Sequence, residues 1–246
     1  MASSTLEADE YTDIDTFIFS GQSATGGRLN VRGVTEDDLF IFESDAGRND
    51  EFIRFEANSV GQSLTFEMRA TAEDDGQIEF VANGNGNSAS AIGFTGNNSF
   101  DEVTIHSTGM NEDANLIHSI GTNGNFYAFN NTDGPTNFNI TGGQDLTITA
   151  AKGVELNRSD DERGFAESVN LDGSGATGDL RIAGSAVNDA IEGGSGDDIL
   201  YGLGGDDILT GNDGADQFRF TNWSGTDEII DFVSDEDVIG LNRIDF

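Results

Sequence analysis

The sequence predicts an all-β protein in which a β-solenoid, or β-helix-like, region is followed by a short parallel β-roll and a C-terminal cap. Short runs of alternating apolar residues recur along residues 14 to 182, separated by clusters of Gly, Asn, Asp and Ser. No long window keeps the 3.6-residue period of a helix. The 246 residues include 33 glycines and one proline, a composition that suits many tight turns.

The alternating runs are the expected strands of the first region. They are Phe17–Phe19, Leu39–Phe42, Phe52–Phe55, Leu64–Met68, Ile78–Val81, Val103–Ile105, Leu116–Ile117, Phe126–Phe129, Phe138–Ile140, Leu146–Ile148 and Leu180–Ile182. The segment 145–150 is echoed by 179–184 and, less closely, by 101–106. Echoes at unequal spacings favour solenoid coils with loops of varying length, although a β-sandwich would also produce them.

A strict nine-residue period begins at residue 184 and runs through four units, 184–192, 193–201, 202–210 and 211–219. Position one is always glycine, position six always aspartate and position eight always apolar. These residues are Gly184, Gly193, Gly202 and Gly211; Asp189, Asp198, Asp207 and Asp216; and Ile191, Leu200, Leu209 and Phe218. We expect six residues of turn and three of strand in each unit, with the side chain at position eight pointing inward.

Two units make one coil, so turns on the same edge are two units apart. This predicts Asp189 beside Asp207 on one edge and Asp198 beside Asp216 on the other. Carboxylates stacked at a strand spacing of roughly 4.8 Å repel each other unless a cation lies between them. Ca²⁺ suits that gap because it takes about six to eight oxygen ligands, and glycine-rich turns can aim carbonyl oxygens at it. Mg²⁺ is smaller and stricter in geometry, and fits less well.

The four units resemble the nonapeptide of the RTX (repeats in toxin) family, Gly-Gly-x-Gly-x-Asp-x-apolar-x. The resemblance covers residues 175–219, where the unit 175–183 keeps the period but has Leu180 in place of the aspartate. It implies a calcium-binding parallel β-roll and type I secretion. The calcium ligands that it predicts are Asp189, Asp198, Asp207, Asp216, Gly184, Gly193, Ser195, Gly202, Gly204 and Gly211.

The residues after the repeats are similar to the segment that closes the roll in serralysin-like secreted proteases. The similarity lies in 227–232, which contains an Asp-Phe pair, and in the apolar stretch of 237–246. A cap is expected here because the end of a solenoid otherwise leaves an open strand edge. The predicted domains are therefore 1–174, a strand-rich region, 175–219, the β-roll, and 220–246, the cap.

The charge of the chain excludes several partners. There are 46 Asp and Glu against 11 Lys and Arg, a formal net charge of −35. Such a field repels nucleic acid and anionic membranes and attracts divalent cations. The N-terminus has no signal-peptide pattern and no stretch approaches the about 18 apolar residues of a membrane span. We expect no nucleic-acid partner, no membrane insertion, and export without a cleaved N-terminal signal unless the chain is an excised piece.

The sequence also predicts that the protein is not an enzyme. It has no cysteine, which excludes a thiolate metal site or a Cys nucleophile. His106 and His118 are the two histidines, and neither begins a His-Glu-x-x-His zinc motif. Ser195 lies between glycines of the repeat rather than in a Gly-x-Ser-x-Gly elbow.

Three functions remain open at this stage. Residues 137–182 resemble the strands that precede a calcium roll in RTX-type surface-layer (S-layer) proteins. That resemblance implies a secreted structural protein of the bacterial cell surface or extracellular matrix, which folds and self-assembles on binding Ca²⁺, with cell-surface polysaccharide as a candidate partner. The alternative is the non-catalytic C-terminal module of a secreted hydrolase or epimerase, serving export and folding. The third is an adhesin, which would need an exposed apolar or aromatic patch. Trp223 with Phe220 is the only hint of such a patch in the sequence. Packing in the core is the simpler interpretation of both residues.

Overall fold

The protein is described from a computed structural model, in which every regular element is a β-strand. The residues described are 2–8, 16–19, 27–43, 52–57, 62–70, 79–80, 92–94, 100–109, 114–117, 120–121, 136–148, 165, 168–221 and 224–241. Within these ranges there is no α-helix, and so none long and apolar enough to cross a membrane.

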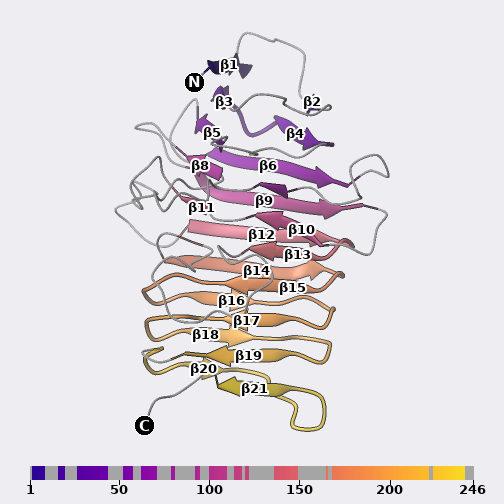
Figure 1. Ribbon diagram of the computed structural model, residues 1–246, viewed down its shortest axis with the longest axis vertical. Coiled ribbons are helices and arrows are strands. Elements are labelled where there is room, and N and C mark those ends of the chain that lie inside the picture. Colours follow the sequence, from indigo (N-terminus) through magenta and orange to yellow (C-terminus); the bar gives the residue numbers. More distant parts are fainter. Residues whose placement is uncertain are drawn as a thin grey trace.

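Among the described strands every pair is parallel, and these strands form three sheets that run along a stack of coils (Figure 1). One sheet of nine strands extends along the whole stack. Its strands in spatial order are β2 (Thr16–Phe19), β4 (Leu39–Phe42), β6 (Gln62–Arg69), β9 (Phe100–Thr108), β12 (Thr136–Gly142), β14 (Val169–Ala176), β16 (Ala190–Glu192), β18 (Ile208–Thr210) and β20 (Glu228–Ile229).

Two shorter sheets complete the coils. A five-stranded sheet belongs to the N-terminal coils and consists of β1 (Ala2–Glu7), β3 (Gly27–Val34), β5 (Phe52–Ala57), β8 (Ile92–Phe94) and β11 (Ile120–Gly121). A seven-stranded sheet extends to the C-terminal coils and consists of β7 (Glu79–Phe80), β10 (Asn115–Ile117), β13 (Leu146–Ile148), β15 (Leu180–Ala183), β17 (Ile199–Tyr201), β19 (Gln217–Phe220) and β21 (Val238–Leu241). The fold is therefore a β-solenoid that continues into a β-roll, as predicted.

Strand alternation builds the core. On β6 the side chains of Leu64, Phe66 and Met68 are buried while their neighbours are partly exposed. Equivalent side chains stack from coil to coil, as in the ring pair Phe17 and Phe40, whose centroids lie 5.2 Å apart. Burial of such columns is the main stabilising contribution, at about 25 cal/mol per Å² of apolar surface.

Most of the predicted strands are present. Ten of the eleven predicted runs overlap strands of the structure, and the eleventh, Phe126–Phe129, lies outside the described residues. The inward position eight of the repeat is confirmed, because those four side chains are at most 1% exposed. Strands β1, β3, β8, β11 and β14 were not predicted.

The division into domains stays a prediction. The nine-stranded sheet passes without interruption through the expected boundary between residues 174 and 175, and β14 spans it. Strands β20 and β21, in the segment predicted as the cap, pair with β18 and β19 and so form one more coil of the stack (Figure 1, yellow end).

Candidate metal centre

The four repeat aspartates lie in two columns, one on each edge of the roll. The register Ala190↔Ile208 places Asp189 next to Asp207, and Ile199↔Gln217 places Asp198 next to Asp216. This is the pairing that the nine-residue period predicted. All four side chains are buried, with exposed fractions between 0% and 4%.

One oxygen of each carboxylate accepts a backbone N–H from the preceding coil. Asp207 Oδ1 accepts from the amide of Asp189 at 2.8 Å, and Asp216 Oδ1 accepts from the amide of Asp198 at 2.9 Å. The first aspartate on each edge does the same with Val169 at 2.9 Å and Leu180 at 2.7 Å. Half of each carboxylate is therefore satisfied by an amide, which reduces the repulsion that the sequence alone predicts.

The second oxygen divides the four aspartates into two kinds. Asp189 Oδ2 accepts from the amide of Ser185, and Asp198 Oδ2 from the amide of Gly194, each at 2.6 Å. Asp207 Oδ2 and Asp216 Oδ2 are buried without a hydrogen-bond partner. An unsatisfied buried polar atom costs about 1–3 kcal/mol, and more if it is charged, so these two oxygens require a cation or a proton.

The glycine at position one brings oxygens of two coils together. A Cβ on Gly184 would lie 2.5 Å from Asp189 Oδ2 and 2.7 Å from the carbonyl oxygen of Gly202. A Cβ on Gly193 would meet Asp198 Oδ2 and, at 2.7 Å, the carbonyl oxygen of Gly211. Any larger side chain would fill this space, so glycine keeps a carboxylate and a carbonyl oxygen free to approach one ion.

Burial raises the pKa of all four aspartates. The pKa reaches about 6 for Asp189 and Asp216 and about 7 for Asp198 and Asp207. Amide hydrogen bonds oppose the effect of burial. For Asp207 the charges of Asp189 and Asp227 raise the pKa further. The carboxylates therefore bind protons readily unless a divalent cation replaces the proton.

The other predicted ligands lie in the same turns. Gly184, Gly193, Gly202 and Gly211 are buried beside the aspartates of their own units. Ser195 is exposed, and its amide donates to the carbonyl of Ala176 at 3.1 Å. Gly204 is partly exposed, and its amide donates to the carbonyl of Ser185 at 3.3 Å. The role of all ten residues as calcium ligands stays a prediction.

A second polar column, at position five, was not predicted. Its side chains accept backbone N–H groups from the following coil at 2.8–2.9 Å. The acceptors are Asp145, Asp179 and Asp197 on one edge, and Asn188 and Asp206 on the other. The sequence feature that could have revealed this column is the Asp-Asp pair in two of the repeats, 197–198 and 206–207.

The donor set suits calcium. The turns offer carboxylate and carbonyl oxygens, which are the hard ligands that Ca²⁺ prefers. Among the described residues, no group of three or more His, Cys, Asp or Glu side chains converges on a common point. The turns instead present one buried carboxylate each, together with backbone oxygens.

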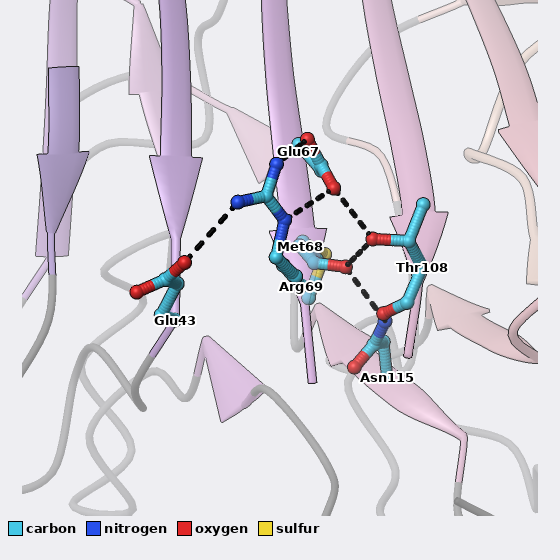
Figure 2. A network of polar contacts seen from close by, with 6 residues as sticks. All are labelled: Glu43, Glu67, Met68, Arg69, Thr108 and Asn115. Carbon is cyan, nitrogen blue, oxygen red and sulfur yellow. Dashed lines mark hydrogen bonds and ion pairs between the residues drawn. The ribbon is translucent and has the colours of Figure 1, made fainter. Parts of the chain in front are cut away.

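A separate polar region lies on the nine-stranded sheet near its N-terminal end. Arg69 donates to both oxygens of Glu67 at 2.8 Å and to Glu43 at 3.2 Å, while the Thr108 hydroxyl donates to Glu67 at 2.7 Å (Figure 2). Burial raises the pKa of Glu67, but these hydrogen bonds and the charge of Arg69 bring it below the usual value. Glu67 is thus held ionised by its neighbours.

Beside this network lies an open depression of about 470 Å³, lined by Glu36, Asp37, Asp38, Leu39, Thr65, Glu67, His106 and Thr108. The His106 ring contacts the Thr141 hydroxyl through Nδ1. His118 and Trp223 lie outside the described residues, whereas Phe220 packs against the core.

Residues 184–218 match the family model of the RTX calcium-binding nonapeptide repeat, in four copies. No curated protein and no solved structure matches the chain significantly. The match covers the four turns whose buried aspartates form the two columns. Repeats of this type bind calcium, so Ca²⁺ is the cofactor of this part of the chain.

Proposed function

We propose that this calcium-binding chain is a structural protein of the bacterial cell surface, which folds and assembles outside the cell when Ca²⁺ binds. The observation that carries the proposal is the pair of buried, unpartnered oxygens, Asp207 Oδ2 and Asp216 Oδ2. Without a cation they oppose folding of the last coils, and with one they become ligands. Folding of the roll is thereby coupled to the calcium concentration around the chain.

This coupling supports secretion through a type I system, the route that the RTX resemblance implies. In the cytosol, where free calcium is low, the aspartate columns keep the roll unfolded, and an unfolded chain can be exported. Outside the cell, calcium binding supplies the free energy of folding. The localisation that we propose is therefore extracellular or on the cell surface.

The last described coil supports self-assembly. Ile229 packs against the core, but six other apolar side chains of this coil are between 39% and 61% exposed: Ile230, Phe232, Val233, Val238, Ile239 and Leu241. Strands β20 and β21 end their sheets, so each has an unpaired edge among the described strands. Exposed apolar surface and free strand edges both favour contact with another chain. The occupant that we propose is a second copy, in a layer or filament of the S-layer or matrix kind.

Cell-surface polysaccharide is the second partner that we propose, at the open depression beside β4, β6 and β9. On this sheet face the polar side chains suit the hydroxyl groups of sugars, and Leu39 suits their apolar ring faces. Because Glu67 is fixed by Arg69 and Thr108, we propose a binding role there and no catalysis.

Electron microscopy and sedimentation of the purified chain test the proposal. We expect ordered sheets or filaments in millimolar Ca²⁺, and dispersed protein in EGTA or in Mg²⁺ at the same concentration. Dispersed protein at every calcium concentration, with the roll folded by circular dichroism, would contradict the structural role and leave calcium binding intact.

The alternative is the non-catalytic C-terminal module of a secreted hydrolase or epimerase. The observation that favours it is that the family match is confined to residues 184–218, a repeat that serves export and folding in this interpretation. A catalytic motif in a longer product of the same gene would decide for it.

A further inference from the structure

The coil after the matched repeats continues their backbone pattern. Within the repeats, the amides of Ile208 and Gln217 donate to the carbonyl oxygens of the aspartates one coil earlier, at 2.9 and 2.7 Å. In the next coil Glu228 and Val238 do the same, both at 2.8 Å. The residues before them, Asp227 and Asp237, therefore occupy position six of two further, degenerate units that the family match does not include.

These two aspartates also extend the hydrogen-bonded columns. Asp227 Oδ1 accepts from the amide of Asp207 at 3.1 Å, and Asp237 Oδ1 accepts from the amide of Asp216 at 3.0 Å. The cap is thus built as a coil of the roll. It lies directly against the turn 211–216, which contains one of the two unpartnered carboxylate oxygens.

The turn 211–216 differs from the first two turns in where its amides point. In turns 184–189 and 193–198 the amide at position two donates to the aspartate of its own turn. In the fourth turn, position two is Asn212 with a φ of +70°, and its amide donates to Asp231 Oδ2 at 2.7 Å. The amide of Gly211 donates to Asp231 Oδ1 at 2.9 Å. Asp231, from the cap, has taken the position-two amide that the first two turns give to their own aspartates.

As a result, Asp216 Oδ2 has no donor although the side chain is 1% exposed. Gly211 lies against this oxygen, since a Cβ there would overlap it. The carboxylates of Asp216 and Asp231 therefore flank the same Gly211–Asn212 peptide. A hard divalent cation gives Asp216 Oδ2 a partner, and each oxygen of Asp231, which accepts one amide, keeps a lone pair with which to ligate the same ion.

We propose that Asp216 and Asp231 hold a further calcium ion, at the junction of the fourth repeat and the cap. This inference rests on the calcium-dependent folding proposed above. The ion would fasten the coil that contains β20 and β21 onto the roll, so docking of the cap is itself calcium-dependent. The choice of Ca²⁺ over Mg²⁺ follows from the irregular mixture of carboxylate and backbone oxygens.

The test is the number of calcium ions bound by Asp231→Asn, with Asp235→Asn as the matched control. Both variants remove one carboxylate from the cap, and Asp235 is exposed. After equilibrium dialysis at a free calcium concentration that saturates the parent, elemental analysis should show one ion fewer per chain in Asp231→Asn and no loss in Asp235→Asn. Equal numbers in the two variants would overturn the proposal.

Asparagine keeps an oxygen that can accept from Gly211, so we expect Asp231→Asn to fold in saturating calcium, as circular dichroism would show. If it does not, anomalous diffraction from the parent grown with calcium decides the question. A peak between Asp216 and Asp231 supports the site, whereas peaks at the first two turns without one here overturn it. A parent that binds no calcium at all would overturn the proposed function as well.

Discussion

At the scale of single residues, the type of side chain at position six changes from coil to coil along one edge of the stack. Asn115, at 0% exposure, donates from its side-chain amide to two carbonyl oxygens at 3.2 and 3.3 Å. Leu146 and Leu180 follow in the same column and pack in the core. Asp198 and Asp216 come next, and a carboxylate can only accept. The column therefore changes from apolar side chains to carboxylates between Leu180 and Asp198, and its first carboxylate oxygen without a hydrogen-bond partner is Asp216 Oδ2.

The two kinds of aspartate predict opposite responses to substitution. Asp189 accepts from Ser185 and Val169 without any ion, so Asp189→Asn should weaken the roll both in calcium and in EGTA. Asp207→Asn removes a buried carboxylate oxygen with no partner. We expect it to require roughly tenfold more calcium for folding, equivalent to about 1.4 kcal/mol, yet to match or exceed the parent in EGTA.

Far-UV circular dichroism during a calcium titration measures this contrast, with the exposed Asp235→Asn as the control for loss of one charge. If Asp189→Asn and Asp207→Asn respond alike in EGTA and alike in calcium, the distinction between satisfied and unsatisfied aspartates is wrong.

The pH dependence of the calcium-free protein follows from the same groups. Burial raises the pKa of Asp198 and Asp207 to about 7, above the usual value of about 3.9 in an unfolded chain. A raised pKa means that the folded state binds the proton more tightly. The contribution of these groups to stability is thus fully present below about pH 4 and is lost as pH rises through about 7.

We therefore expect the thermal midpoint of the roll in EGTA to fall between about pH 5 and pH 8, and calcium to abolish this fall because the ion replaces the proton. Differential scanning calorimetry at both pH values measures it. A calcium-free midpoint that is constant or rises over that range would show that the aspartates are not protonated in the folded roll.

At the scale of elements, the regular repeats were predictable and the irregular coils were less so. The period of nine residues fixes both the turn and the strand, so β16 to β19 and their pairing follow from the spacing of Gly, Asp and the apolar position. The calcium-binding turns could be predicted for the same reason. The unsatisfied state of Asp207 and Asp216 could not, because it accompanies a backbone conformation, positive φ at Leu203 and Asn212, that the spacing of the repeat does not report.

Strand β14 illustrates why other elements were missed. Its sequence contains Gly173 and Gly175, which favour a turn when taken alone. In the structure both are needed for close packing between coils. A Cβ on Gly173 would lie 2.5 Å from the carbonyl oxygen of Glu192, and one on Gly175 would lie 2.8 Å from the Thr141 side chain. Such contacts join residues far apart in sequence, and no local pattern reports them.

The change in the position-six column predicts which elements need calcium. Strands β9 and β12 pack through apolar side chains such as Val103, Ile105 and Phe138, whereas β16 to β19 adjoin the aspartate turns. Hydrogen exchange should therefore show that amides of β9 and β12 stay protected in EGTA, while those of β16 to β19 are protected only with calcium. Loss of protection in all of these strands together would mean that the upstream coils depend on the roll.

At the scale of the whole molecule, the fold is a one-dimensional stack in which each coil contacts its neighbours. Sheet order follows coil order from β2 to β20 without a crossover between distant coils (Figure 1). In such a stack, stability is a sum of local contributions, and one end can unfold while the other stays folded. The calcium-binding repeats lie toward one end of this stack, since they occupy residues 184–218 and the cap follows them.

This arrangement predicts that unfolding is not two-state when calcium is limiting. Trp223, the single tryptophan of the chain, follows the repeats in sequence and can report on the C-terminal end by fluorescence, while circular dichroism reports on all strands. In urea, the fluorescence transition should move to higher urea as calcium is raised, and most of the circular dichroism transition should stay in place. Mg²⁺ at the same concentration is the control, because it fits the oxygen ligands less well and should leave both curves unchanged. Coincident curves at every calcium concentration would instead mean that the solenoid and the roll fold as one cooperative unit.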